Sequence, residues 1–368
     1  MGKKIKHRLC WMSIPILFMM LVAYYGLYDD GKRSNLVQVS HAKSAFNTAA
    51  ASNVNVYLGG EPIGVKLNTK GVLVVALSDI ETSRGKVTSP AALAGIQVGD
   101  NIIKVNDVYV KNAEQTQTEI NKAKEKSIKI LVERNGKSME KTVKPVSALE
   151  GNNYKIGLWI RDSTAGIGTL TFYDEKSGMF AALGHPITDI DTGTKLNINS
   201  GEIVSASIVS IKKGLEGNPG ELKGIFVNED VKLGDITKNT ECGVFGKVNT
   251  NFKCKSSKSI KICLKKDIKE GPAKIFTTIS GEKPEYYDIQ IEKLLSQNSP
   301  GPKSMVIKVT DPRLLAKTGG IVQGMSGSPI IQNNKLVGAV THVLINKPQV
   351  GYGIYIDWML KDANIMSK

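Results

Sequence analysis

A run of short apolar segments separated by glycines, over residues 151–368, constrains the fold more than any other feature of this sequence. Segments such as 168–172, 205–211 and 337–343 are rich in β-branched and apolar residues and are too short for ordinary helices. Few helices are predicted before the last residues of the chain. Many short strands with turn residues at their ends are typical of a β-barrel or a sandwich, so we expect a mainly β domain at residues 149–368.

The region before it mixes strand and helix signals. Ser89 and Pro90 form a helix-start signal, and Gly95 is a helix-stop signal. We therefore expect a separate α+β domain at residues 54–148. Its predicted elements are strands at 54–58, 71–77, 101–105 and 127–133 and a polar-faced helix at 113–124.

Residues 1–28 carry a targeting signal. An uncharged stretch at 9–28 follows four basic residues and meets Asp29 and Asp30. Its length is close to the roughly 20 residues that a membrane-spanning helix needs. Basic residues before the stretch and acids after it predict a cytoplasmic amino end and an exported remainder. No small-x-small cleavage site follows the apolar core, which favours an uncleaved signal anchor, although cleavage further downstream stays open. Residues 29–53 are polar and small, and are predicted to form a flexible linker.

The formal net charge of +15 comes mainly from lysine. The basic residues are spread along the chain, and no nucleic-acid-binding motif is found among them. Phosphate recognition by two parallel hydrogen bonds prefers arginine. We therefore expect no nucleic-acid partner.

The four cysteines do not indicate a disulfide scaffold. Cys10 lies in the predicted membrane segment and leaves an odd trio, Cys242, Cys254 and Cys263. No CxxC spacing and no nearby histidine support a zinc site. One disulfide pair stays open, and we expect no metal site.

Residues 324–329 read Gly-Met-Ser-Gly-Ser-Pro and contain a candidate nucleophile, Ser326. A serine hydroxyl is a poor nucleophile until an imidazole takes its proton, and it also needs donors for the oxyanion. Gly324 permits a turn that could aim the backbone N–H groups of Gly324 and Ser326 at that oxyanion. The same segment could also be a turn without chemistry.

Two histidines are candidates for the base, since His7 precedes the membrane segment and His41 lies in the linker. His185 follows small and apolar residues at a predicted strand end, where an imidazole could project into a cleft. His342 lies inside a predicted strand after the serine. We expect His342 to be a structural, hydrogen-bonded histidine and His185 to be the base.

The third member of a triad is less defined by the residues. Asp311 lies fifteen residues before Ser326 and keeps the order His, Asp, Ser. Asp189 and Asp191 are competitors close to His185, and either could cap a turn instead.

Residues 89–106 closely resemble the core signature of PDZ domains of the bacterial protease-associated type. That resemblance implies capture of an extended peptide at a sheet edge, with a backbone nest for its terminal carboxylate. The loop expected to form the nest contains Ile63, Gly64 and Val65. An ordinary turn at Gly64 is the alternative.

Residues 184–189 and 318–332, taken with the anchor and the PDZ-like region, resemble the stage IV sporulation protein B (SpoIVB) peptidase family. The resemblance implies a trypsin-like β-barrel peptidase domain at 149–368. By motif, it makes Ser326 the nucleophile, His185 the general base and Asp311 the orienting acid in preference to Asp189. This chemistry needs no metal or organic cofactor.

The resemblance also implies a biological role. Members are signalling serine peptidases that are secreted from the forespore into the intermembrane space and process themselves. They cleave a membrane-associated regulatory protein, which leads to activation of a late mother-cell sigma factor. Two alternatives stay open: a catalytically inactive PDZ-containing scaffold, and a broad-specificity envelope quality-control protease. Those quality-control enzymes usually place the PDZ domain after the peptidase.

Overall fold

The structure, a computed structural model, describes residues 54–149, 153–253 and 259–366. The predicted anchor at 1–28 and linker at 29–53 lie outside the described residues, as does Cys254. Within the three described ranges, no helix is long and apolar enough to cross a membrane.

The described chain is mainly β, as expected. Its first part contains these elements: β1 (Asn55–Leu58), β2 (Pro62–Leu77), β3 (Ile80–Thr82), β4 (Gly85–Val87), α3 (Pro90–Leu93), β5 (Asn101–Val105), β6 (Val108–Tyr109), α4 (Ala113–Ala123), β7 (Ile128–Arg134), β8 (Lys137–Val143), β9 (Val146–Ser147) and β10 (Tyr154–Lys155). The predicted strands at 101–105 and 127–133 and the predicted helix at 113–124 are confirmed as β5, β7 and α4.

The remainder is strand-rich to its end. Its elements are β11 (Leu158–Asp174), β12 (Met179–Ala182), β13 (Ile198–Lys212), β14 (Glu221–Thr240), β15 (Gly243–Val248), β16 (Ser259–Ile262), the short 3₁₀ helix η1 (Lys265–Asp267), β17 (Gly271–Thr277), β18 (Glu285–Leu294), β19 (Met305–Val309), α5 (Pro312–Thr318), β20 (Pro329–Gln332), β21 (Lys335–Leu344), β22 (Lys347–Tyr355) and α6 (Ile356–Asp362).

Two closed antiparallel barrels organise these strands. The first runs β2–β11–β12–β15–β14–β13 and returns to β2. The second runs β17–β18–β19–β22–β21–β20 and returns to β17. Closure pairs every strand on both sides and removes the sheet edges. Further strand pairing joins the two barrels. Strand β1 pairs with β11 of the first barrel and with β16, and β16 pairs in parallel with β21 of the second barrel.

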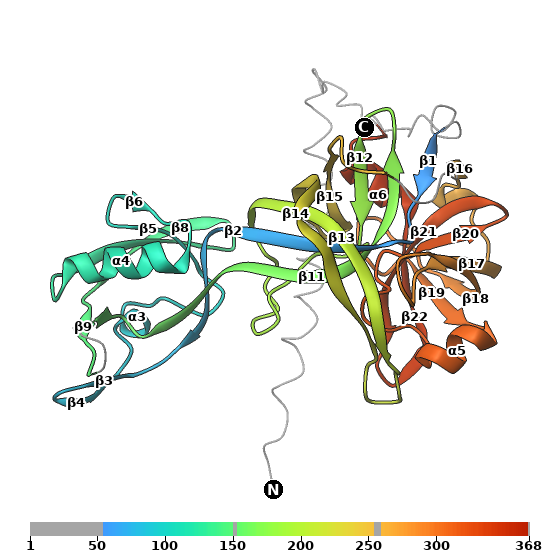
Figure 1. The fold of residues 1–368 in the computed structure, drawn as a ribbon. Helices are drawn as coiled ribbons and strands as arrows, with labels where there is room; N and C mark the ends of the chain where they lie inside the picture. The colour runs from blue at the N-terminus through green and yellow to red at the C-terminus, as the bar shows by residue number, and fades with distance from the viewer. Residues whose placement is uncertain (1–53, 150–152, 254–258, 367–368) are drawn as a thin grey trace, which may run out of the picture. The chain divides into compact units, whose positions relative to one another are not determined.

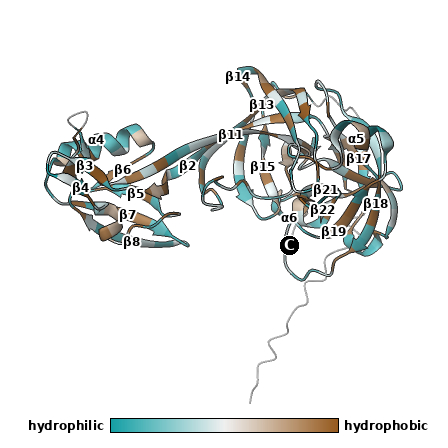
Figure 2. Cartoon of the chain, turned by 90° about the horizontal axis from the view of Figure 1, so that it is seen from below, coloured by the Kyte–Doolittle hydropathy of each residue, from teal (hydrophilic) through white to brown (hydrophobic). Residues whose placement is uncertain are grey.

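Each barrel buries its own apolar core. Ile63, Val65 and Phe180 are among the buried residues of the first barrel, and Ile275 and Val337 are among those of the second. The strands of both barrels carry hydrophobic segments, drawn in brown (Figure 2). Alternate residues along a strand point to opposite faces, so one apolar face of each strand fills the barrel interior.

The α+β region has a third core, formed by buried residues such as Val72, Ile102 and Ile130. Its strands pair in the order β2–β5–β7–β8. Arg134 donates to both carboxylate oxygens of Asp100, at 2.6 and 2.8 Å, and so ties β7 to the turn before β5.

Strand pairing places this α+β region inside the first barrel's sequence. The chain leaves the barrel along β2 and returns along β11, which pair with each other over most of their length (Figure 1). The domain limit drawn from sequence at residue 54 is therefore corrected. Residues 57–58 and the first half of β2 pair with the barrel strands β11 and β13, and residues 55–57 pair with β16.

Candidate active site

Ser326 lies in the loop between α5 and β20. Gly319 ends α5 in the left-handed conformation, with φ of 76°. Met325 is fully buried and belongs to the core of the second barrel. The Ser328 hydroxyl is buried too, at 2.8 Å from Thr277 Oγ1 and 2.6 Å from the Met325 carbonyl. The neighbours of Ser326 thus anchor the loop and leave Ser326 on its cleft side.

Strand β11 fixes the carbonyl groups of the same loop. Thr169 donates its backbone N–H to the Ser326 carbonyl at 3.1 Å and its hydroxyl to the Gly324 carbonyl at 2.8 Å. Gly324 has a φ of +95°, a conformation that glycine adopts readily. The N–H groups of Gly324 and Ser326 have no hydrogen-bond partner in the described part of the chain. Both are free to meet an oxyanion.

His185 follows β12 through a strained turn. Leu183 has a φ of 68°, which costs a non-glycine residue about 1–3 kcal/mol and is typical of functional sites. The Nδ1 atom of His185 lies 2.7 Å from the carbonyl oxygen of Pro186. A carbonyl only accepts, so Nδ1 carries the proton and Nε2 keeps its lone pair. Burial lowers the pKa of His185, and the Pro186 carbonyl partly opposes that effect.

Asn239 in β14 holds the segment after His185 in place. Its side-chain oxygen accepts the Ile187 N–H at 2.8 Å, and its amide nitrogen donates to the carbonyls of Ile187 and Leu196 at 2.8 and 3.0 Å. Sequence reasoning missed this residue, because an asparagine inside a polar strand carries no local signal of a partner 52 residues away.

The structure brings Ser326 and His185 to one cleft of about 580 Å³, lined by both. The Ser326 hydroxyl donates to the carbonyl of Thr341 at 2.8 Å. It must therefore rotate to pass its proton to His185. Apart from two histidines, no side chain that lines this cleft in the described residues is ionisable at neutral pH.

His342 is the second histidine of the cleft. Its ring centroid lies 5.0 Å from that of His185, with 44° between the ring planes. Its Nδ1 atom is buried and has no hydrogen-bond partner within the described residues. Burial, and to a lesser degree His185 and Lys303, lower the pKa of His342 to about 4. The prediction that His342 is a hydrogen-bonded structural histidine is therefore wrong for its Nδ1 atom.

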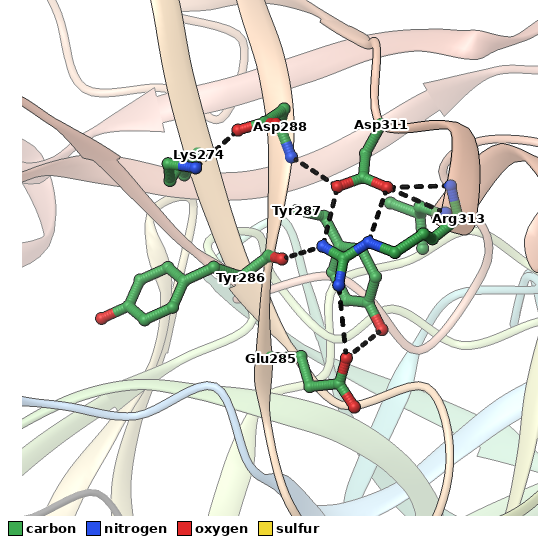
Figure 3. A network of polar contacts seen from close by, with 8 residues as sticks. Lys274, Glu285, Tyr286, Tyr287, Asp288, Asp311 and Arg313 are labelled. Atoms are coloured by element: carbon green, nitrogen blue, oxygen red, sulfur yellow. Dashed lines mark hydrogen bonds and ion pairs between the residues drawn. The ribbon is translucent and has the colours of Figure 1, made fainter.

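Asp311 makes no hydrogen bond or ion pair with His185 in the described residues. It caps α5, with one carboxylate oxygen accepting the Arg313 N–H at 2.9 Å and the other accepting the Asp288 N–H at 3.2 Å. The Arg313 guanidinium also donates to both oxygens (Figure 3). That ion pair lowers the pKa of Asp311 to about 2, against the effect of burial. The prediction that Asp311 orients the base is therefore corrected, because its oxygens are engaged at the start of α5.

The two competing acids do not contact His185 either. Asp189 accepts the N–H groups of Asp191 and Thr192, at 3.1 and 2.9 Å, and so caps a turn. Arg161 donates to the carboxylates of Asp189 and Asp191. Burial raises the pKa of Asp189, but these bonds outweigh it and the pKa is lowered overall. All three candidate acids are thus paired with arginines.

A second candidate site is a groove of about 610 Å³ in the α+β region. Residues of α4 and the first residues of β11, among them Leu158 and Ile160, line it. Gly157 lies at its edge with a φ of +75°, and a Cβ there would come within 2.4 Å of the Ser78 carbonyl. The Gly157 N–H has no hydrogen-bond partner in the described residues. This geometry suits a nest for a terminal carboxylate.

The predicted carboxylate loop at Ile63, Gly64 and Val65 is corrected. These residues lie inside β2, paired with β11 and β13, and the side chains of Ile63 and Val65 are buried in the first barrel. The same apolar-Gly-apolar pattern recurs at residues 156–158, beside the groove. This Ile-Gly-Leu segment is the signal that sequence reasoning passed over.

The described cysteines form no cluster. Cys242 is buried and Cys263 is partly buried; both are free, and burial raises the pKa of each thiol. Among the described residues, no group of three or more His, Cys, Asp or Glu side chains is arranged to hold a metal ion.

Comparisons with known proteins match two parts of this chain to two families. The family described as SpoIVB peptidase S55 matches residues 152–360, and the PDZ domain family matches residues 82–134. The PDZ domain of the SdrC-like protein Lmo2051 from Listeria monocytogenes is 20% identical, and the match covers 25% of this chain and 87% of that chain with a TM-score of 0.20. The active form of the Rv3671c protease from M. tuberculosis is 11% identical, with 55% and 74% covered and a TM-score of 0.34.

Proposed function

Because the chain belongs to the SpoIVB peptidase S55 family, we propose that it is a sporulation signalling serine endopeptidase with Ser326 as nucleophile and His185 as general base. The observation that carries the proposal is the cleft that both residues line, together with two N–H groups on the serine loop that have no partner among the described residues. A PDZ domain accompanies the peptidase.

In the proposed reaction, Ser326 Oγ attacks the carbonyl carbon of the scissile peptide bond while His185 Nε2 takes the hydroxyl proton. The carbonyl electrons move onto oxygen, which the N–H groups of Gly324 and Ser326 stabilise. His185 then protonates the leaving nitrogen as the C–N bond breaks. A water molecule, deprotonated by His185, cleaves the resulting ester and releases Ser326 with its proton restored.

The cleft supports a substrate with uncharged residues at the scissile bond. Its walls include Ile321, Val322 and Val343, and its described lining carries no carboxylate, lysine or arginine. A charged side chain would lose its hydration there without gaining a partner. The substrate is therefore a protein segment with small or apolar residues around the cleaved bond.

The groove beside α4 supports recruitment of a peptide carboxyl terminus. An extended peptide would add to β11 by main-chain hydrogen bonds, with its carboxylate at the nest around Gly157. In this proposal the peptide partner binds at residues 156–160 rather than at 63–65.

The family supports the finer biological assignment. We propose that the exported part cleaves a membrane-associated regulatory protein in the forespore intermembrane space, and that this leads to activation of a late mother-cell sigma factor. The anchor at residues 1–28 is part of the same proposal.

The enzyme assignment is tested with the full-length chain in detergent and a fluorophosphonate probe, which labels activated serines. Wild type should be labelled, whereas Ser326→Ala and His185→Ala should lose at least about 99% of the labelling rate, as removal of a nucleophile or base requires. The matched control is Ser210→Ala, an exposed serine in β13, which should label as wild type does.

Three other outcomes reject the proposal. Labelling that persists in Ser326→Ala moves the nucleophile elsewhere. Absent labelling of the folded wild type under all conditions favours a PDZ-containing scaffold. Indiscriminate digestion of unfolded proteins favours a quality-control protease.

A further inference from the structure

His342 lies beside the proposed base without a task in the reaction described above. It follows Thr341 in β21. The carbonyl oxygen of Thr341 accepts a hydrogen bond from the Ser326 hydroxyl. Its ring is 5.0 Å from that of His185 between centroids, and both rings line the cleft. A second imidazole is therefore packed against the first.

The buried Nδ1 of His342 has no hydrogen-bond partner in the described residues. Leaving a buried polar atom unpaired costs free energy, and proteins keep such atoms mainly where a ligand, a water molecule or a functional step uses them. Since His342 lines a cleft that contains the candidate nucleophile, we look for a partner of its Nδ1 atom among the groups that take part in the reaction.

His185 has no carboxylate partner among the described residues. Asp189 and Asp191 are held by Arg161, and Asp311 is held by Arg313. In its resting pose the ring of His185 is bonded to the carbonyl of the next residue, Pro186. When His185 takes the proton of a serine, the imidazolium needs a further acceptor that stabilises its charge.

We propose that His342 is the positioning residue for His185. Its neutral ring packs against the base and limits the base's rotation. During catalysis its Nδ1 accepts the Nδ1–H of the His185 imidazolium in place of the Pro186 carbonyl, while the Nε2–H stays directed at the leaving nitrogen. No proton is transferred to His342, and no substrate bond forms or breaks on it. The inference rests on the proposed function, because it concerns the same Ser326 and His185.

The charges around His342 suit this role. The groups that act on its titration are His185 and Lys303, and the Lys303 ammonium lies 5.2 Å from the Tyr352 ring centroid. Because burial and these two groups lower its pKa to about 4, His342 is neutral at pH 6–8, where His185 must exchange protons. A neutral ring accepts a hydrogen bond, whereas a protonated ring would repel the imidazolium.

The test compares His342→Phe, which keeps a flat ring without nitrogen, with His342→Gln, which keeps a hydrogen-bond acceptor. The second-order rate of fluorophosphonate labelling is measured from pH 5 to 9 in the full-length protein, together with the thermal midpoint. We expect His342→Phe to label about 100-fold more slowly, in the range for loss of general-base assistance. Its pH profile should also move to lower pH, because the imidazolium of His185 has lost an acceptor.

His342→Gln should recover labelling to within about 10-fold of wild type, since it restores an acceptor. Wild-type rates and pH profile in His342→Phe would overturn the proposal. Equal losses in both variants with an unmoved pH profile would also overturn it, because they indicate packing alone. If His342→Phe does not fold, His342→Leu replaces it in the same comparison.

The design separates this inference from the proposed function. Labelling that depends on Ser326 but is indifferent to His342 rejects only the role of His342. Labelling that ignores Ser326 rejects the proposed function itself.

Discussion

At the scale of single residues, Asp311 stabilises the approach to the nucleophile loop. Its side chain is buried, caps α5 and pairs with Arg313, and α5 leads directly into the loop that carries Ser326. An aspartate at the cap followed by proline at the first helical position is a strong helix-start signal. We therefore assign Asp311 to the fold of the loop.

Asp311→Asn should lower the free energy of unfolding at pH 7 by about 1–2 kcal/mol, because the amide still caps the helix but loses the ion pair with Arg313. The pKa of this carboxyl is lowered from 3.8 to about 2, chiefly by Arg313. Its contribution is thus present above pH 4 and is lost as the pH falls from 4 towards 2. Urea unfolding at pH 7, 4 and 3 should show the difference from wild type shrinking on acidification.

The control for Asp311 is Asp230→Asn, an exposed acid in β14, which should unfold as wild type does. Unchanged stability with a labelling rate reduced by orders of magnitude would instead return Asp311 to the catalytic machinery.

That Ser326 and His185 would line a cleft was predictable, because the signal for each is local. The glycines and the buried Met325 that shape the nucleophile loop are contained in six consecutive residues. The contacts of Asn239 and His342 were not predictable from the sequence. They join strands that only the closed barrels bring together: Asn239 bonds the Ile187 backbone, and the ring of His342 packs against that of His185. Sequence order likewise does not show that Arg313 captures the carboxylate of Asp311.

At the scale of elements, β11 connects three features. Its first residues, including Leu158 and Ile160, line the groove, and its middle residues 164–168 line the cleft. Thr169 and Thr171 then bond the carbonyls of the nucleophile loop. A peptide that adds to the start of β11 therefore acts on the strand that holds the loop of Ser326.

We expect a short peptide with an apolar residue at a free carboxyl end to bind the groove and to change the labelling rate of Ser326 at least about 5-fold, a common size for coupling between two sites. The same peptide with an amidated end should bind weakly, because the nest is built for a carboxylate. Binding is measured by fluorescence anisotropy, and labelling is measured with and without the peptide.

Gly157→Ala should abolish both effects, since its Cβ would collide with the Ser78 carbonyl. Gly136→Ala is the matched control, because Gly136 has the same φ of +75° but open space around it. Binding without any change in labelling would contradict the coupling through β11, and equal binding of acid and amide would contradict the nest.

The length of β2 and β11 explains why the domain limits were misjudged. Each strand passes from a barrel into the PDZ-containing region without a break in pairing, apart from local register shifts. Turn and apolar patterns reveal where strands begin and end, but they do not reveal which strands pair. The partners of residues 62–69 are distant in sequence, at 163–169 and 198–205. Short strands and α4 within the region were predictable, because their pattern is complete within each segment.

At the scale of the whole molecule, the PDZ-containing region is an insertion in the first barrel, bounded by β2 and β11. Residues 55–58 precede this insertion in sequence, yet they pair with β11 and β16 of the peptidase. The peptidase fold therefore begins at β1. Removing residues after 55 would break strand pairing, whereas removing residues before it would spare every described strand.

This limit predicts where the self-processing implied by the family resemblance should occur. A protease cleft binds its substrate as an extended segment, and residues paired in a sheet reach that cleft only after local unfolding. We expect wild type to acquire a new amino terminus upstream of Asn55, and Ser326→Ala to keep its original one. Mass spectrometry of both purified chains, expressed in parallel, measures this directly.

Tagged Ser326→Ala mixed with wild type then separates cleavage between molecules from cleavage within one. Processing at the same position in Ser326→Ala alone would assign the cut to another protease. A new terminus between residues 59 and 149 would contradict the limit, because it would remove β1 and, for any terminus after Pro62, part or all of β2, which the peptidase fold requires.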